Sequence, residues 1–153
     1  MSNHREHVRA GAVAGGATAA FLARNQPSHF ALAEIFAGSI GGVFGAKLPD
    51  VLEPAIHSWH RSSAHSISAA GGVALVAVRQ LQNWQEYCRT NTAQHSVQLA
   101  AATEPLARMW HGLLMVVWSL LAGFAPGVVA GYLSHLAMDA CTPRGIPVFC
   151  RGS

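Results

Sequence analysis

The chain has 153 residues, of which 51% are hydrophobic and only 11% are charged, and its formal net charge is +3. A typical soluble domain carries about 25% charged residues, so this chain has too few charges to cover a globule of its size with polar surface, and a membrane is the expected solvent for part of it. The positive charges are scattered along the chain rather than gathered into a basic run, which argues against nucleic acid as a partner.

Two apolar segments in the N-terminal half predict packed helices. Residues 10–23 are uncharged and rich in alanine and glycine, although they are short for a membrane span. A turn at residues 25–28 precedes a second helix, from about 29 to 46, which we expect to end at Leu48-Pro49-Asp50 because proline lacks an N–H. Glycines weaken an isolated helix, so we expect another helix to pack against the four in this segment, which are Gly38, Gly41, Gly42 and Gly45.

The C-terminal half contains a third apolar helix, a polar stretch and one long apolar segment. Residues 66–81 have a helical pattern, and residues 80–108 predict an amphipathic helical excursion on the aqueous side. Residues 109–138 contain no Asp, Glu, Lys or Arg and are the one segment of convincing membrane length. Ala125-Pro126-Gly127 interrupts them and predicts two helices or one kinked helix. The expected fold is all-α: one membrane-associated bundle of about four hydrophobic helices plus the polar excursion, forming a single domain over residues 1–153.

Nine histidines nearly equal the ten Lys and Arg residues, and several are grouped. His135 and Asp139 lie four residues apart near the end of the last apolar segment. On a helix this spacing puts both side chains on one face, with Cβ atoms about 5–6 Å apart, where they can hold one metal ion or form a hydrogen-bonded pair that fixes two helices. Other metal-competent side chains lie at the ends of apolar segments, namely His7, Asp50, His60 and His65. Antiparallel helices would bring all these places to one end of the bundle.

These residues resemble the motifs of a known family, the membrane-bound metal-dependent hydrolases typified by the LexA-regulated inner-membrane protein family. The matches follow the family's order over nearly the whole chain: His7, Leu48-Pro49-Asp50, His60-Arg61-x-x-x-His65-Ser66 and Gly131-Tyr132-x-Ser134-His135-x-x-x-Asp139-x-x-Thr142-Pro143-x-Gly145. The chain departs from the family pattern after Asp50, where Leu52 and Glu53 stand in place of a second Asp and a His.

The resemblance implies a divalent-metal site at the membrane surface that activates water for hydrolysis. The ligands it implies are His7, Asp50, His65, His135 and Asp139. In the same reading His60 is a ligand or a proton shuttle, and Arg61 holds an anionic oxygen such as that of a phosphate. Glu53 would take the place of the missing family groups.

The expected cofactor is zinc, with manganese or iron as alternatives, and the expected substrate is a phosphoester or lipid-like molecule in a bacterial inner membrane. Membrane lipid is therefore the expected partner, and the glycine rows are also compatible with a homo-oligomer. The rival interpretation is a non-catalytic membrane protein that keeps the metal for structure or assembly, which the departure at Leu52 and Glu53 favours. His29, His95 and His111 have no partner at ligand spacing, and we expect them to be ordinary polar or interfacial residues.

Overall fold

The computed structural model describes residues 4–52 and 67–141. Within these ranges the chain forms four helices and no strand: α1 (His4–Leu22), α2 (Ser28–Leu52), α3 (Ile67–Ala101) and α4 (Pro105–Ala140). The expected all-α bundle is confirmed.

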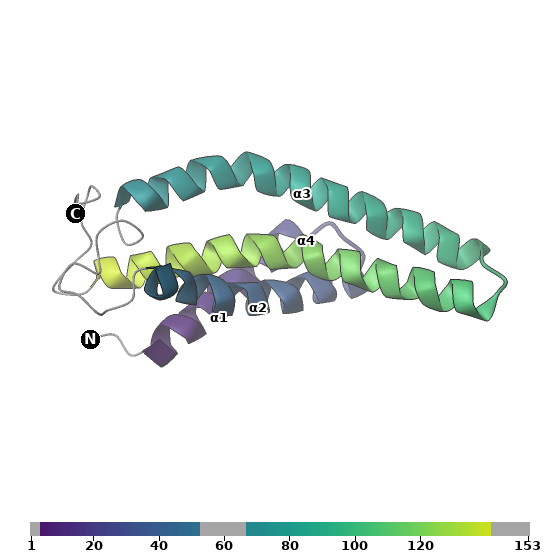
Figure 1. Ribbon diagram of the computed structural model, residues 1–153, viewed down its shortest axis with the longest axis horizontal. Coiled ribbons are helices and arrows are strands. Elements are labelled where there is room, and N and C mark those ends of the chain that lie inside the picture. The colour runs from purple at the N-terminus through teal and green to yellow at the C-terminus, as the bar shows by residue number, and fades with distance from the viewer. Residues whose placement is uncertain (1–3, 53–66, 142–153) are drawn as a thin grey trace.

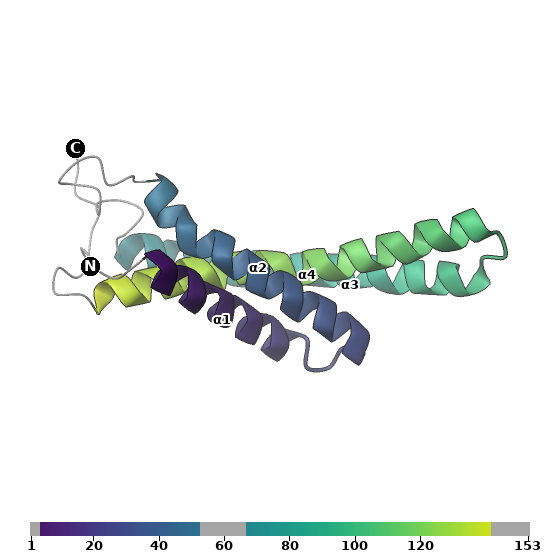
Figure 2. The ribbon, with the colours of Figure 1, turned by 90° about the horizontal axis from the view of Figure 1, so that it is seen from below.

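Helix α4 is the centre of the bundle, because α1, α2 and α3 all pack against it and α1 also packs against α2. The start of α1, the end of α2 and the end of α4 lie at the same end of the molecule (Figures 1 and 2). At the other end, α3 and α4 continue past α1 and α2 as a two-helix hairpin, which both views show. The antiparallel arrangement therefore gathers three separate chain positions at one end.

The close packing of α1, α2 and α4 depends on glycines. A Cβ atom added to Gly42 of α2 would collide with the backbone of Gly11 in α1. One added to Gly131 of α4 would collide with the backbone of Gly42, and one added to Gly45 with that of Val128. Only glycine lets helix backbones approach this closely, so the expectation that another helix packs on these glycines is confirmed.

Helix α2 does not end at Leu48-Pro49-Asp50 as predicted, but continues through Pro49 to Leu52. Proline inside a helix removes one backbone hydrogen bond and crowds the preceding turn. Here Pro49 is fully buried, so packing inside the bundle compensates for the local cost. The extra turn keeps Asp50 on a helix rather than in a loop.

The last apolar segment forms one continuous helix, so the alternative of two helices is wrong. Pro126 has no N–H to donate to the carbonyl oxygen of Ala122, four residues earlier. Gln85 of α3 donates its side-chain amide to that oxygen at 3.3 Å, and Trp84 donates its indole N–H to the neighbouring Leu121 carbonyl oxygen at 3.0 Å. The Gln85 amide thus takes the place of the missing backbone donor to Ala122, and Trp84 adds a hydrogen bond one residue earlier.

Two other boundaries differ from the sequence prediction. The polar excursion at residues 80–108 is not a separate element, because it forms the second half of α3, the turn at 102–104 and the start of α4. Helix α1 begins at His4, so His7 lies inside the first helix and not ahead of it. Glu6 in the first turn favours this early start, since a negative charge there complements the helix dipole.

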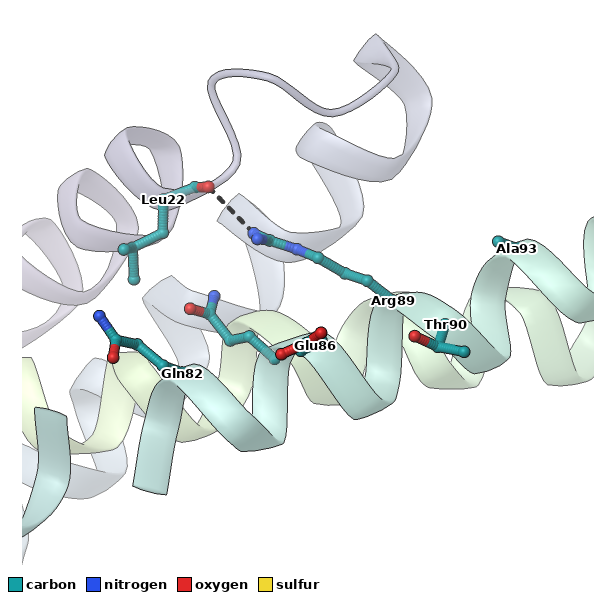
Figure 3. A pocket seen from close by; sticks show the side chains of 7 residues that line it. Leu22, Gln82, Glu86, Arg89, Thr90 and Ala93 are labelled. Carbon is teal, nitrogen blue, oxygen red and sulfur yellow. Dashed lines mark hydrogen bonds between the residues drawn. The ribbon is translucent and has the colours of Figure 1, made fainter. Parts of the chain in front are cut away.

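An ion pair between a buried carboxylate and a partly buried guanidinium, which the sequence did not predict, joins three helices on one side of the bundle. Arg89 of α3 donates to both carboxylate oxygens of Glu34 in α2, at 3.0 and 2.6 Å. The same guanidinium donates to the Leu22 carbonyl oxygen at the end of α1, at 3.0 Å, beside a hollow of about 510 Å³ (Figure 3). The Glu34 side chain is almost fully enclosed, at 1% exposure, so this pair fixes α3 against α1 and α2.

Candidate metal centre

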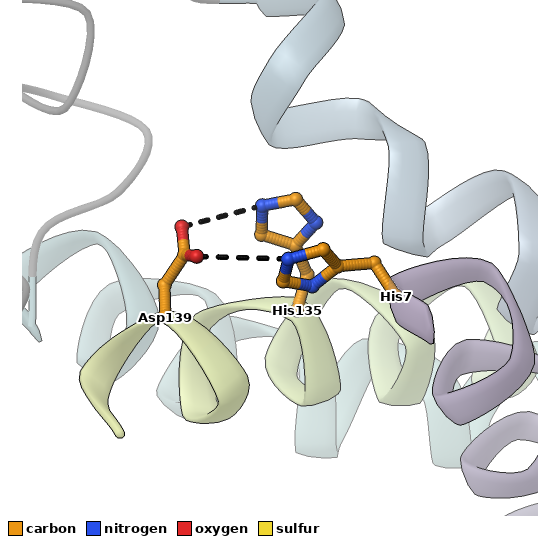
Figure 4. Close-up of side chains that lie close together, drawn as sticks. All are labelled: His7, His135 and Asp139. Carbon is orange, nitrogen blue, oxygen red and sulfur yellow. Dashed lines mark ion pairs between the residues drawn. The ribbon is translucent and has the colours of Figure 1, made fainter. Parts of the chain in front are cut away.

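Three side chains that the sequence predicted as ligands meet at the shared end of α1, α2 and α4. His7 comes from α1, and His135 and Asp139 come from α4 (Figure 4). All three are buried, and each offers one ligand atom within 4.8 Å of the other two. Asp50, near the end of α2, also reaches this cluster. Four of the residues assigned as metal ligands from the sequence therefore lie together.

The separations in the cluster suit a single small cation. His135 Nε2 lies 3.5 Å from Asp139 Oδ2 and 3.6 Å from Asp50 Oδ1, and His7 Nε2 lies 3.7 Å from Asp139 Oδ1. Two ligands that are each about 2.1 Å from a tetrahedral zinc ion lie about 3.4 Å apart. Two imidazoles and two carboxylates form a donor set that zinc, manganese and iron accept, so the residues fit a divalent metal.

A backbone contact sets the chemical form of His135. Its Nδ1 lies 2.6 Å from the carbonyl oxygen of Ala46 in α2. A carbonyl oxygen can only accept, so Nδ1 carries the proton, and in the neutral ring Nε2 has the lone pair that faces the carboxylates. Metal-ligating histidines are commonly held this way by a hydrogen bond from the second ring nitrogen. The His7 ring stacks on His135, with centroids 4.1 Å apart and an angle of 23° between the planes.

Glycine packing explains why the two histidines meet. Gly11 lies one turn after His7, and Gly131 lies one turn before His135. Both glycines pack directly on the backbone of Gly42 in α2. Gly42 holds α1 and α4 close together at one point. Because the two helices run in opposite directions, the turn before Gly11 and the turn after Gly131 lie side by side, and this places His7 next to His135. The glycine row therefore positions the cluster as well as packing the helices.

The remaining predicted site residues, Glu53, His60, Arg61 and His65, lie outside the described residues, so their roles stay predictions. Asp50 differs from the other three members of the cluster, because 46% of its side chain is exposed whereas the side chains of His135 and Asp139 are almost fully buried. Among the residues that the structure describes, the cluster is thus more exposed on the side of Asp50 than on the side of the bundle.

Two of the other histidines, which the sequence predicted to be ordinary polar or interfacial residues, contact each other. His95 in α3 and His111 in α4 face one another, with their Nδ1 atoms 3.1 Å apart. Neither has a ligand one turn away along the chain, so local spacing gave no signal. Both lie eight residues from position 103 in the turn at 102–104, and an antiparallel hairpin about this turn could have predicted the pairing. His29 contacts only the Phe30 ring among the interactions described.

Two helices are long and apolar enough to cross a membrane by length and composition, α2 and α4. Large apolar side chains on their outer surfaces are well exposed, for example Phe36 at 63%, Phe44 at 58% and Met109 at 66%. A core helix of a soluble protein would bury such residues. The fold and the cluster therefore define an all-α membrane protein with a buried histidine–aspartate group that could hold a metal ion.

The family comparison agrees with this class. The profile of the YdjM inner membrane protein family matches residues 1–150, and the chain belongs to that family. Searches of curated proteins and of solved structures found no significant match.

Proposed function

We propose that this membrane protein is a multi-pass, metal-dependent hydrolase that acts on a phosphoester or lipid-like substrate, with zinc as the first candidate metal and manganese or iron as alternatives. The observation that carries the proposal is the meeting of His7, His135 and Asp139, with ligand atoms within 4.8 Å, at one end of an apolar bundle. Buried ionisable groups are costly next to a membrane and are therefore expected to serve a function.

The exposure of Asp50 favours catalysis over a purely structural metal. A structural site encloses its metal with protein ligands, whereas a catalytic site keeps one position open. The cluster combines three buried members with Asp50, which is nearly half exposed. This arrangement leaves a side from which water and substrate can approach.

A divalent ion held by these residues would lower the pKa of water towards neutrality and polarise the bond to be cleaved. The side chains of the chain have separate tasks. The Ala46 carbonyl keeps His135 in the tautomer whose Nε2 can ligate. Arg61 binds an anionic substrate oxygen with its two-pronged guanidinium, and His60 moves the proton released from water. His65 and Glu53 complete the ligand set.

The test combines metal analysis with turnover on detergent-purified, full-length protein. Wild type is compared with Asp139→Asn, and with Glu86→Gln as a matched control, because Glu86 is an exposed carboxylate on α3. We expect Asp139→Asn to bind one metal equivalent less than wild type, while Glu86→Gln matches wild type. Arg61→Ala should keep the metal but lose most phosphoester hydrolysis in mixed micelles.

The results also separate the two interpretations. Metal bound at the cluster without hydrolysis of any phosphoester would favour the rival function, a non-catalytic membrane protein with a structural metal. Equal metal content in wild type and Asp139→Asn would overturn both interpretations.

A further inference from the structure

The hairpin of α3 and α4 carries a second pair of facing histidines, far along the chain from the cluster described above. His95 and His111 are both half-buried, and their rings are stacked at an angle of 27° with centroids 5.4 Å apart. Their Nδ1 atoms are 3.1 Å apart. The pair lies near the end of α3 and the start of α4, on either side of the turn at 102–104.

The separation of the two nitrogens is the spacing of neighbouring metal ligands. Nitrogens that are each about 2.0–2.1 Å from one ion lie about 2.8 Å apart in square-planar geometry and about 3.4 Å apart in tetrahedral geometry. The observed 3.1 Å falls between these values. In the hydrogen-bonded alternative, one Nδ1 donates its proton to the other, so the two neutral rings take opposite tautomers and either ring can be the donor.

The surroundings of the pair allow a hydrated ion to enter. The second half of α3 exposes polar side chains to the outside, among them Glu86, Thr90, Gln94 and Gln98. This face of α3 is polar, whereas α4 exposes Met109, Trp110 and Leu113 on the turns around His111, so a hydrated ion can approach the pair from the side of α3. Because both rings are only half-buried, a metal ion can bind them without a large desolvation cost.

We propose that His95 and His111 form a second metal site, which binds one borderline transition-metal ion such as Zn²⁺, Cu²⁺ or Ni²⁺ and clips α3 to α4. Imidazole nitrogens favour these ions over Mg²⁺ and Ca²⁺, which prefer oxygen ligands. When the ion binds, the ring that donated its Nδ1–H carries the proton on Nε2 instead, so both Nδ1 lone pairs face the ion, which links the two antiparallel helices at this level of the hairpin. The site shares no residue with the cluster of His7, His135 and Asp139.

The experiment measures zinc bound to detergent-purified, full-length protein without a polyhistidine tag, by competition with a chromophoric chelator. Five chains are compared: wild type, His95→Asn, Asp139→Asn, the double variant, and His29→Asn as a control whose ring lies against Phe30. His95→Asn should bind one equivalent less than wild type, and His29→Asn should match wild type. The double variant should bind one equivalent less than Asp139→Asn.

A second readout guards against misfolding. Zinc should raise the thermal midpoint of Asp139→Asn but not that of the double variant, while both keep the helical circular dichroism of wild type. Equal zinc content in wild type and His95→Asn would overturn the proposal and leave a hydrogen-bonded pair. One equivalent in wild type that is lost in His95→Asn but kept in Asp139→Asn would support this site and reject the hydrolase centre, so the two proposals fail separately.

Discussion

Two groups of buried ionisable side chains lie in this bundle, and they are built differently. The Glu34 carboxylate and the Arg89 guanidinium are in direct contact at 2.6 and 3.0 Å, and Arg89 also binds the Leu22 carbonyl oxygen at 3.0 Å. In the cluster at the other end, the corresponding separations between Asp139 and the two histidines are 3.5 and 3.7 Å. The first group is closed on itself, whereas the second has the spacing of ligands around a common centre.

The two groups compensate for the free-energy cost of burying a charge in two different ways. A charge removed from water must be compensated by a partner or a metal. Direct contact between opposite charges, as between Arg89 and Glu34, links two helices. Donors held apart by backbone packing, as the glycines at Gly42 hold His7 and His135, leave space for an ion. Distance therefore separates the structural pair from the candidate functional site.

The largest effect on the free energy of unfolding should come from breaking the Glu34–Arg89 ion pair. Arg89→Met leaves the Glu34 carboxylate buried without its cation, and we expect a loss of about 3–5 kcal/mol in the free energy of unfolding. Adding Glu34→Gln should recover at least half of this loss, because no charge then stays buried. Chemical denaturation in detergent measures both values. Arg24→Met, at an exposed position, is the control and should change stability by less than about 0.5 kcal/mol. A similarly small effect at Arg89 would contradict a structural role for the pair.

A comparable substitution in the cluster of His7, His135 and Asp139 should change stability only when metal is bound. Asp139→Asn keeps the shape of the side chain and removes a buried negative charge, so without metal we expect stability within about 1 kcal/mol of wild type. With zinc at a hundred times its dissociation constant, wild type should gain about 2.7 kcal/mol that the variant lacks. Unfolding with zinc and with a chelator gives the comparison. A loss of several kcal/mol in the chelator would instead make the cluster a structural contact like the Glu34–Arg89 pair.

A smaller effect should come from the hydrogen bond beside Pro126. Gln85→Leu removes the donor to the Ala122 carbonyl oxygen, and we expect a cost of about 1–2 kcal/mol because that oxygen is left without its partner. In a Pro126→Ala background the backbone N–H returns, so the same substitution should cost less. A double-mutant cycle measures the coupling. Equal costs in both backgrounds would mean that Gln85 does not compensate for the proline.

The smallest effect concerns the reactivity of the Cys88 thiol, which lies near the Glu34–Arg89 pair. Burial raises the pKa of the Cys88 thiol to about 11, with the Glu34 charge adding to the shift and Arg89 opposing it. At pH 8 about one thiol in a thousand would then be the reactive thiolate. In a Cys141→Ser, Cys150→Ser chain we expect very slow maleimide labelling that speeds up as the pH rises towards 11. A Cys88→Ser chain, which keeps the exposed Cys141, should label quickly. Fast labelling of Cys88 at pH 8 would show that this interface opens readily.

Much of the cluster could be predicted from the sequence because its information is local. The spacing of His135 and Asp139 places both on one helix face, and the alternation of helix direction brings His7 and Asp50 to the same end. Composition predicted a membrane environment, the apolar segments predicted the helices, and the glycine row predicted close helix contacts. These features follow from the periodicity and polarity of short segments, which can be read from the sequence without knowing which segments pack together.

Other features were decided by tertiary structure because they depend on contacts between distant residues. Local rules predict that one helix ends at Pro49 and that another is divided or kinked at Pro126, whereas α2 and α4 continue through these prolines, with Pro49 buried and donors from α3 beside Pro126. The pairing of Glu34 with Arg89 joins positions 55 residues apart. The local sequence shows where a charge or a proline would destabilise a helix. The partner that compensates for it comes from a distant part of the chain and is known only from the packed bundle.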